Sequence, residues 1–411
     1  MAVAIPVTDG MTVDVDPQAK QRTPTTGGGQ QQEQAKKGLD LVKKMSPKSV
    51  APQEAPRSQG KKKVGNKVAV SNLSSPPDAA TARAYMCKHD WPAGVQTNLL
   101  RSCEKYPIRY FIIDDSGSMN TNDGHRIIGE APNQKMIKCT RWSELTSCLK
   151  FYAELSHAAR APTEFRFLNM AEPIVVGMRG DDEGRGLEAF LSVIKDEQPG
   201  GQTPLCQQVL EVIASIKSYE QELRAAGQRA VVVVATDGEA TDGDLVEAMR
   251  ELQYLPVWLV IRICCDTPEI IEYWNGIDGE LEIDMDVLDD IAGEAEEIKS
   301  ANPWLRYSEP LHKLREFGSC LREMDLVDES LLTSEQMTVV CNMLLCGPDD
   351  PPLPSPDIDY AAFLQCVQAQ MRRVPQIFDP IETKMVPPIN LLKLAESYDA
   401  GMKKSSSCAV M

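Results

Sequence analysis

RYFIIDDSGSMN, which spans residues 109–120, joins a run of aromatic and β-branched residues directly to two aspartates, two serines and a glycine. An unbroken apolar run of this kind predicts a β-strand that is buried on both faces. The oxygen-bearing side chains then follow at the carboxyl end of the strand, which is where open α/β sheets bind their ligands. The stretch therefore predicts a central strand with a polar site at its end.

The alternation of strands and helices extends this prediction to the fold. Helical periodicity follows the first strand, and two further apolar runs, VVVVA and VWLVI, come later in the chain. Strands that alternate with helices favour a doubly wound α/β domain, with a mainly parallel sheet and helices on both faces. With a lead-in helix, this domain is expected to span residues 84–300. The expected strands are 109–113, 164–169, 173–178, 229–238 and 256–265, and the expected helices are 141–160, 204–225 and 243–255.

Composition and charge exclude several classes of function. The 411 residues carry a net charge of −17, and a negative protein is a poor candidate for generic binding of nucleic acid. No apolar run approaches the length that spans a bilayer, and the N-terminus lacks the basic and apolar regions of a secretory signal. The 12 cysteines are scattered, without C-x-x-C pairs or zinc-ligand spacing. We therefore expect a cytoplasmic protein with reduced thiols that is not secreted.

The first 83 residues differ from the rest in composition. They are rich in Gln, Gly, Pro, Ser and Lys and contain few large apolar residues, as in TTGGGQQQEQAKKG. Such a segment cannot bury enough apolar surface to offset the entropy of ordering, so we expect a disordered, locally basic tail at 1–83. A solvated tail is the preferred interpretation, and contact with an anionic lipid surface is the alternative.

Three stretches supply oxygen ligands for a hard cation. Asp114, Ser116 and Ser118 alternate in the first stretch, so a turning loop can direct all three to one point. Thr203 lies in a Gly-rich loop before a long helix, and Asp237 ends an apolar strand. One sheet edge would bring these stretches together, and their carboxylate and hydroxyl oxygens suit the octahedral coordination of Mg²⁺. The alternative is that each motif is only a turn or a helix cap.

The set of Asp114, Ser116, Ser118, Thr203 and Asp237 resembles the metal-ion-dependent adhesion site of von Willebrand factor type A (VWA) domains. The order of the ligands, their places at strand ends and the Thr ahead of a helix all match. This resemblance implies a Mg²⁺ site, with Mn²⁺ as the alternative ion. It also implies that an acidic side chain of a protein partner completes the coordination of the metal.

The resemblance has one departure. An insertion, residues 119–140, separates the first ligand loop from the helix that follows it. The insertion either shapes the choice of partner or covers the metal site. The nearby acids Asp115, Glu239, Asp242 and Asp244 are interpreted as groups that raise the local affinity for cations without binding the ion.

The same loops argue against an enzyme. A metal-assisted hydrolase needs a general base beside the metal, and His125 in the insertion is the one histidine suited to that role. A solvated loop histidine is the preferred interpretation of His125. We therefore expect a binding protein without catalytic residues, and the alternative is a metal-assisted hydrolase or a regulatory subunit of a larger enzyme complex.

Residues 301–400 change to helices with Pro-rich connections and resemble a degenerate EF-hand pair. Asp325 takes the first position of one loop and Thr333 its ninth, and Ile358 stands where paired loops would hydrogen-bond. Both loops lack the oxygen ligands that Ca²⁺ requires, so we expect a helical module that binds no calcium. The alternatives are an unrelated helical extension and, for function, a calcium-responsive sensor. The departures are Val327, Ser330 and Gln336 in the first loop and Pro351 and Ala362 in the second.

The chain ends in GMKKSSSCAVM, a flexible tail at 401–411 in which Cys408 begins a C-a-a-X box. Met at the last position favours a farnesyl group on Cys408. One prenyl chain binds membranes only marginally, so Lys403 and Lys404 or the basic N-terminal tail are expected to assist. The sequence thus predicts a non-enzymatic intracellular adaptor that binds an acidic protein partner through Mg²⁺ and is held at the cytoplasmic face of a membrane.

Overall fold

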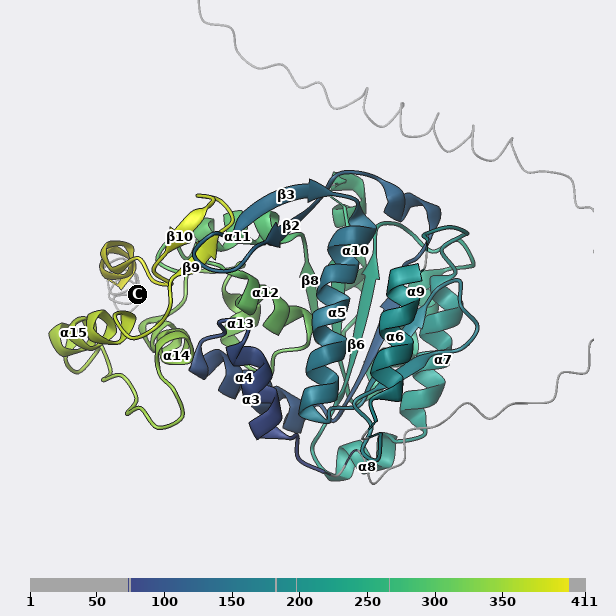
Figure 1. The fold of residues 1–411 in the computed structure, drawn as a ribbon, viewed down its shortest axis with the longest axis horizontal. Helices are drawn as coiled ribbons and strands as arrows, with labels where there is room; N and C mark the ends of the chain where they lie inside the picture. The colour runs from purple at the N-terminus through teal and green to yellow at the C-terminus, as the bar shows by residue number, and fades with distance from the viewer. Residues whose placement is uncertain (1–72, 74, 182, 197, 266, 399–411) are drawn as a thin grey trace, which may run out of the picture. The chain divides into compact units, whose positions relative to one another are not determined.

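The computed structural model describes residues 73, 75–181, 183–196, 198–265 and 267–398. It contains a six-stranded sheet with helices on both sides (Figure 1). Its strands are β1 (Ile108–Ile113), β4 (Thr163–Phe167), β5 (Ile174–Val176), β6 (Ala230–Thr236), β7 (Val257–Ile263) and β8 (Met285–Leu288). The order is β5–β4–β1–β6–β7–β8, and every neighbouring pair is parallel except β4 with β5. The α/β class with a mainly parallel sheet is therefore confirmed.

The chain changes its direction of travel across the sheet after β5. From β1 it builds β4 and β5 on one side, and it then returns to place β6 on the other side of β1. The loops that leave β1 and β6 therefore start from adjacent strand ends, at the change of direction where α/β folds bind ligands. The register pairs Ile113 with Ala235, so Asp114 and Asp237 follow neighbouring strand ends.

Successive residues of the central strands point to opposite faces of the sheet, and each face has its own hydrophobic core. Tyr110 and Ile112 belong to one core, whereas Phe111 and Ile113 belong to the other. Because both faces are covered, these strands are apolar throughout. The Tyr110 face is closed by α7 (Leu205–Lys217), α8 (Glu220–Ala225), α9 (Leu245–Met249) and α10 (Pro268–Glu280).

The core on the Phe111 face joins elements from both ends of the described chain. It is closed by α3 (Ala79–Cys87), α4 (Ala93–Lys105), α5 (Arg141–Ala159), α6 (Arg185–Asp196), α11 (Ile291–Ala301) and α12 (Glu309–Glu316). The side chain of Asp78 accepts the N–H of Thr81 and caps α3. Helical structure therefore begins before residue 84, where the tail was expected to end.

The segment that follows α11 packs on this face of the sheet through α12 and the turn after it. The ring of Phe317 lies 6.2 Å from that of Phe111 and 5.4 Å from that of Tyr152. Gly318 approaches β6 so closely that an added Cβ would lie 2.8 Å from a methyl group of Val231. The boundary expected at residue 300 thus does not separate two cores. The remaining elements are α13 (Glu323–Leu326), α14 (Ser334–Leu345), α15 (Tyr360–Met371), β9 (Ile377–Asp379) and β10 (Lys384–Val386).

The loops that resemble EF-hands differ from a paired EF-hand. Thr333 and Gln336 form a capping box that starts α14. However, Ile358 is 88% exposed, and its N–H donates to the carbonyl of Ser355. It forms no β-bridge within the described residues, so the pairing of loops expected at Ile358 is wrong.

Several elements differ from those expected from periodicity. The helix expected at 204–225 is divided into α7 and α8, and α9 continues as a 3₁₀ turn over Arg250–Tyr254. The insertion at 119–140 contains an antiparallel hairpin of β2 (Gly124–Ile128) and β3 (Lys135–Cys139). The first ligand loop is therefore followed by a structured hairpin rather than by an open loop.

Candidate functional site

The carboxyl ends of β1 and β6 hold a group of carboxylates and hydroxyls. Asp114 is fully buried, and one of its oxygens accepts the N–H of Ser116 at 2.9 Å. The other oxygen accepts the hydroxyl of Thr236, the last residue of β6, at 2.6 Å. Burial raises the pKa of the Asp114 carboxyl above its ordinary value, and the nearby charge of Asp237 adds to this rise against the opposing hydrogen bonds from Thr236 and Ser116.

Asp237 links the end of β6 to the first ligand loop. The hydroxyl of Ser118 donates to Oδ1 of Asp237 at 2.8 Å and lies 2.9 Å from the hydroxyl of Ser116. Oδ2 of Asp237 accepts Nη1 of Arg141 at 2.8 Å. Asp114, Ser116, Ser118 and Asp237 therefore form one hydrogen-bonded group, which we call the strand-end cluster.

Thr203 lies in a loop that is attached to both strand ends. Its N–H donates to the hydroxyl of Thr241 at 3.1 Å, and its carbonyl accepts the N–H of Thr241 at 2.9 Å. On the other side, the N–H of Gly200 donates to the carbonyl of Asp115 at 2.7 Å. The three stretches singled out in the sequence thus meet at one edge of the sheet, and Thr203 is joined to the others through its backbone.

The additional acids near the cluster hold the loops in place. Asp115 accepts the N–H and the side-chain amide of Asn169, at 3.0 and 2.8 Å, and so ties the end of β1 to the end of β4. Asp242 accepts two N–H groups at the start of α7, at 3.0 and 2.8 Å. Asp244 caps α9. These acids therefore have structural partners that the sequence interpretation did not foresee.

Arg141 is the basic residue of the site, and the sequence analysis did not single it out. It begins α5, and its Nε donates to Oδ1 of Asp123 in the insertion at 2.8 Å while Nη2 donates to Oδ2. The hydrogen bonds with Asp123 and Asp237 raise the pKa of Arg141, against the opposing effect of burial. One signal was present in the sequence: the helix dipole disfavours a cation in the first turn, so an arginine there usually has an acidic partner.

The hairpin of the insertion is anchored beside the cluster. The N–H of Arg141 donates to the carbonyl of Thr121 at 3.0 Å, and the N–H of His125 donates to the side chain of Glu144 at 2.8 Å. Nδ1 of His125 lies 3.6 Å from Oδ2 of Asp290. The imidazole is thus directed to Asp290, and the hairpin is fixed at its base on α5.

The donor set of the strand-end cluster fits a hard cation. The groups that meet in it are carboxylates and hydroxyls, which are the ligands that Mg²⁺ prefers. The charge of Asp237 disfavours ionisation of the buried Asp114, and a bound cation would relieve this repulsion. Arg141 already neutralises part of the charge of Asp237. Asp114, Ser116, Ser118, Thr203 and Asp237 are the residues that would hold the ion.

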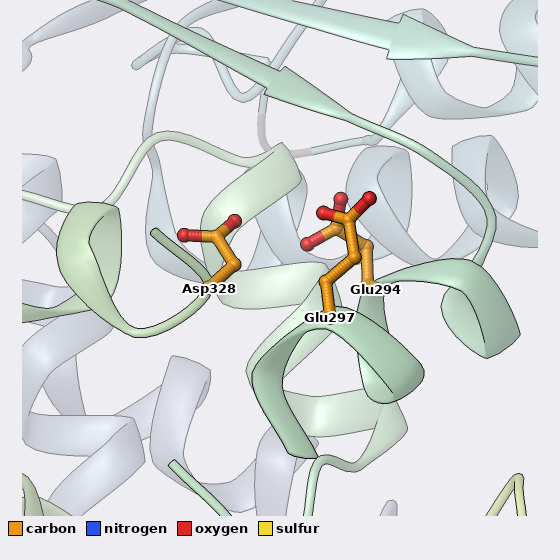
Figure 2. Close-up of side chains that lie close together, drawn as sticks. All are labelled: Glu294, Glu297 and Asp328. Atoms are coloured by element: carbon orange, nitrogen blue, oxygen red, sulfur yellow. The ribbon is translucent and has the colours of Figure 1, made fainter. Parts of the chain in front are cut away.

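A second group of carboxylates lies between α11 and the turn that follows α13 (Figure 2). It consists of Glu294, Glu297 and Asp328, and each contributes an oxygen that lies within 4.8 Å of the others. We call it the α11 cluster. Burial raises the pKa of Glu294 to about 7, although Arg315 opposes the shift. The sequence analysis missed this group because acids on a helix are usually solvated, and periodicity does not show which tertiary partner they meet.

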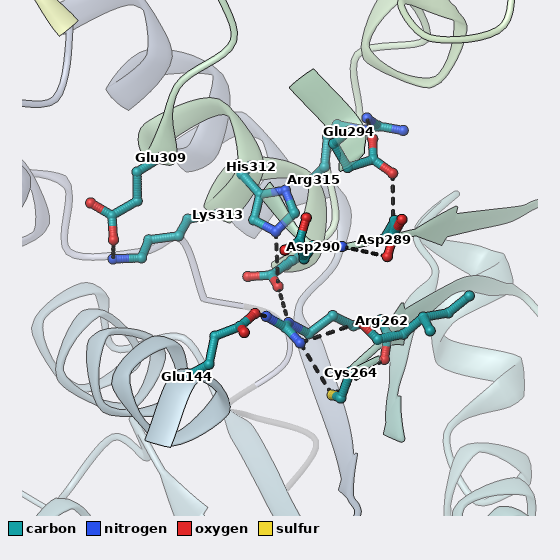
Figure 3. Close-up of polar contacts among 12 residues, drawn as sticks. Glu144, Arg262, Cys264, Asp289, Asp290, Glu294, Glu309, His312, Lys313 and Arg315 are labelled. Atoms are coloured by element: carbon teal, nitrogen blue, oxygen red, sulfur yellow. Dashed lines mark hydrogen bonds and ion pairs between the residues drawn. The ribbon is translucent and has the colours of Figure 1, made fainter. Parts of the chain in front are cut away.

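A buried ionic network connects α12 to the sheet (Figure 3). Glu316 of α12 accepts from Arg262 of β7, and Nε2 of His312 lies 3.4 Å from the same carboxylate. Although burial opposes it, His312 and Arg262 hold the pKa of Glu316 well below its usual value. Arg109 of β1 donates to the carbonyl of Phe317 at 2.9 Å. Arg262 and Arg109, which lie inside apolar strands, thus contact α12 and the residue that follows it.

Comparisons with known proteins assign no family to the chain. No protein-family model matches it, and no curated protein matches it. Within the described residues, no helix combines the length and the apolar character needed to cross a membrane. Cys408 and most of the N-terminal tail, residues 1–72, lie outside the described residues, so the predictions made for them remain predictions.

Proposed function

We propose that the protein is a VWA-like adaptor that binds a protein partner through Mg²⁺ at the strand-end cluster. The observation that carries this proposal is the hydrogen-bonded meeting of Asp114, Ser116, Ser118 and Asp237 at adjacent strand ends. The mainly parallel sheet and its change of direction between β1 and β6 support the VWA-like interpretation of the fold.

The residues of the site act by binding and positioning. When bound, Mg²⁺ supplies a concentrated positive charge that attracts a carboxylate of the partner. Arg141 orients Asp237 and adds a second positive charge, which favours an anionic partner further. The hairpin of the insertion stands beside this charge, so its exposed residues are in a position to contribute to partner choice.

The place of His125 supports a role in binding rather than catalysis. This residue is the general base that a hydrolase at the site would require, and its ring is directed to Asp290. The proposal also includes a membrane anchor at Cys408. A farnesyl group there would hold the adaptor at the cytoplasmic face of a membrane, with basic residues as the second signal.

Calorimetric titration of the full chain with Mg²⁺ tests the metal site. Wild-type protein should bind Mg²⁺, and Asp114→Ala and Asp237→Ala should lose this binding while remaining folded by circular dichroism. Asp244→Ala is the matched control, because it removes a nearby acid that caps α9. That control should lose about 1 kcal/mol of stability and keep its affinity for Mg²⁺. Unchanged titration heats in the first two variants would contradict the proposal.

The partner is sought by affinity capture in Mg²⁺ and, in parallel, in chelator. Proteins retained by the wild type only in Mg²⁺ and lost with Asp237→Ala are the expected partners. Retention that is equal in Mg²⁺ and chelator would show that binding does not use the metal. Incubation with farnesyltransferase, followed by mass spectrometry of the wild type and Cys408→Ser, tests the anchor separately.

A further inference from the structure

The turn after α13 is held firmly against the end of α11. The side-chain amide of Asn302 donates to the carbonyls of Val327 and Ser330, both at 2.7 Å. Its Oδ1 accepts the N–H of Leu332 at 3.1 Å. Asn302 is itself fully buried, as the residue that ends α11. Asp328, which lies within this turn, is therefore held opposite the side chains of α11.

Two glutamates of α11 meet Asp328. Glu294 and Glu297 are three residues apart and so lie on one face of the helix. In Figure 2 the carboxylates of all three residues extend toward the same space above α11 and the turn. Three oxygen ligands from two separate elements thus converge.

Negative charge exceeds positive charge in this region. Arg315 of α12 pairs with Asp286, Glu294 and Asp328, and it is the cation that the described residues supply to these three carboxylates. Glu297 adds a fourth carboxylate beside them. One guanidinium therefore faces four acids, and buried carboxylates require compensating charge.

One oxygen of Asp328 lacks a partner. Oδ2 pairs with Arg315, whereas Oδ1 is buried and has no hydrogen-bond partner within the described part of the chain. The side chain of Asp328 is only 10% exposed. An unsatisfied buried acceptor costs about 1–3 kcal/mol. The unsatisfied Oδ1 is therefore evidence for a ligand that is not a side chain of the described residues.

We propose that Glu294, Glu297 and Asp328 bind a Ca²⁺ ion that connects α11 to the turn after α13. Carboxylate oxygens are hard ligands, and Ca²⁺ accepts six to eight oxygens at about 2.3–2.6 Å in irregular geometry. One ion can thus touch oxygens up to about 5 Å apart, and water completes its coordination on the exposed side at Glu297. Mg²⁺ requires a nearly ideal octahedron, which three carboxylates fixed on separate elements supply less readily.

This site differs both from an EF-hand and from the strand-end cluster. Asp328 takes the fourth position of the EF-like loop, which is not a ligand position in EF-hands, and the other two ligands come from outside the loop. None of the three residues belongs to the strand-end cluster. The ion adds a second connection, beside Asn302, between the EF-like segment and α11.

Titration of the full chain with Ca²⁺ tests the site. Glu297→Gln should weaken Ca²⁺ binding roughly ten- to a hundred-fold. Glu297 is exposed, and the described residues give it no ion pair, so this variant should fold normally. Glu296→Gln changes the neighbouring exposed acid, which pairs with Lys299, and should bind Ca²⁺ as the wild type does. Asp328→Asn should weaken binding as Glu297→Gln does, with its folding followed by thermal unfolding.

The outcomes separate this proposal from the one at the strand ends. The strand-end residues are intact in all three variants, so Mg²⁺ binding that depends on Asp114 and Asp237 should be unchanged. Absence of wild-type binding at about 1 mM Ca²⁺, or equal Ca²⁺ affinity of the wild type and Glu297→Gln, would overturn the calcium site. Mg²⁺ binding that Glu297→Gln weakens as strongly as Ca²⁺ binding would overturn the choice of ion.

Discussion

The strand-end cluster and the α11 cluster both combine carboxylates with one arginine, but they neutralise charge in different ways. At the strand ends, hydroxyl groups donate to the two aspartates, and Arg141 contacts only one of these. In the α11 cluster and the adjoining Asp286, Arg315 alone pairs with three carboxylates. Hydroxyl donors thus make the strand-end carboxylates less dependent on a single cation, whereas the carboxylates of the α11 cluster depend on Arg315.

The largest effect is therefore expected from Arg315→Met. This change leaves three buried or nearly buried carboxylates without their cation and should lower the free energy of unfolding by about 3–5 kcal/mol. Urea denaturation followed by circular dichroism measures it. Arg373→Met removes an exposed pair with Asp350 and should change stability by less than about 1 kcal/mol. If Arg315→Met and Arg373→Met lost similar stability, the statement that the α11 cluster depends on Arg315 would be wrong.

Arg141→Met tests the corresponding arginine at the strand ends. The guanidinium competes with a metal for Oδ2 of Asp237, so its removal should tighten Mg²⁺ binding by about tenfold. Calorimetric titration gives the affinity, and Lys138→Met, an exposed change in the adjoining hairpin, should leave it unchanged. Weaker binding in Arg141→Met would instead show that Arg141 organises the ligands more than it competes with the ion.

The smallest effect concerns Asp325, at the border of the α11 cluster. Burial, together with the charges of Asp286 and Glu329, raises its pKa to about 7 from 3.8. Because the folded-state pKa lies above the unfolded value, the wild type loses stability as the pH rises from about 4 to about 7. Asp325→Asn should therefore be more stable by about 1 kcal/mol above pH 7, once solvent screening is allowed for.

Thermal unfolding at several pH values measures this effect. The gain from Asp325→Asn should shrink as the pH falls toward 3.8, because the wild-type carboxyl is then neutral in the folded state and only half ionised in the unfolded state. Asp349→Asn, at an exposed position, serves as the control and should show no such pH dependence. A gain that is constant from pH 4 to pH 8 would show that charge repulsion is not its cause.

The central strands could be predicted from the sequence because burial on both faces leaves an unbroken apolar run. The short edge strand β8 could not, since Asp286 interrupts it and only four residues form it. Similarly, α6 has Phe190 as its one fully buried residue, which is too weak a signal for a core helix. The strand β8 and the helix α6 thus depend on tertiary partners that lie far away in the sequence.

The meeting of the oxygen-bearing residues at the strand ends could be predicted because each follows a recognisable strand or precedes a helix. Arg141 and Asp123 could not, because their pairing depends on the fold of the insertion. The α11 cluster depends on Asn302, whose side chain brings a distant turn to the helix. Residue type and spacing therefore located the strand-end cluster, and only the assembled chain revealed the α11 cluster.

The packing of Phe317 and Gly318 on the sheet has a practical consequence for fragments of this protein. A shortened version that stopped at residue 300 would uncover the aromatic surface around Phe111 and leave Arg109 and Arg262 without their acceptors on α12 and at Phe317. Exposed apolar surface of this kind promotes aggregation. Recombinant fragments intended for solubility screens or partner capture should therefore extend at least to Tyr398.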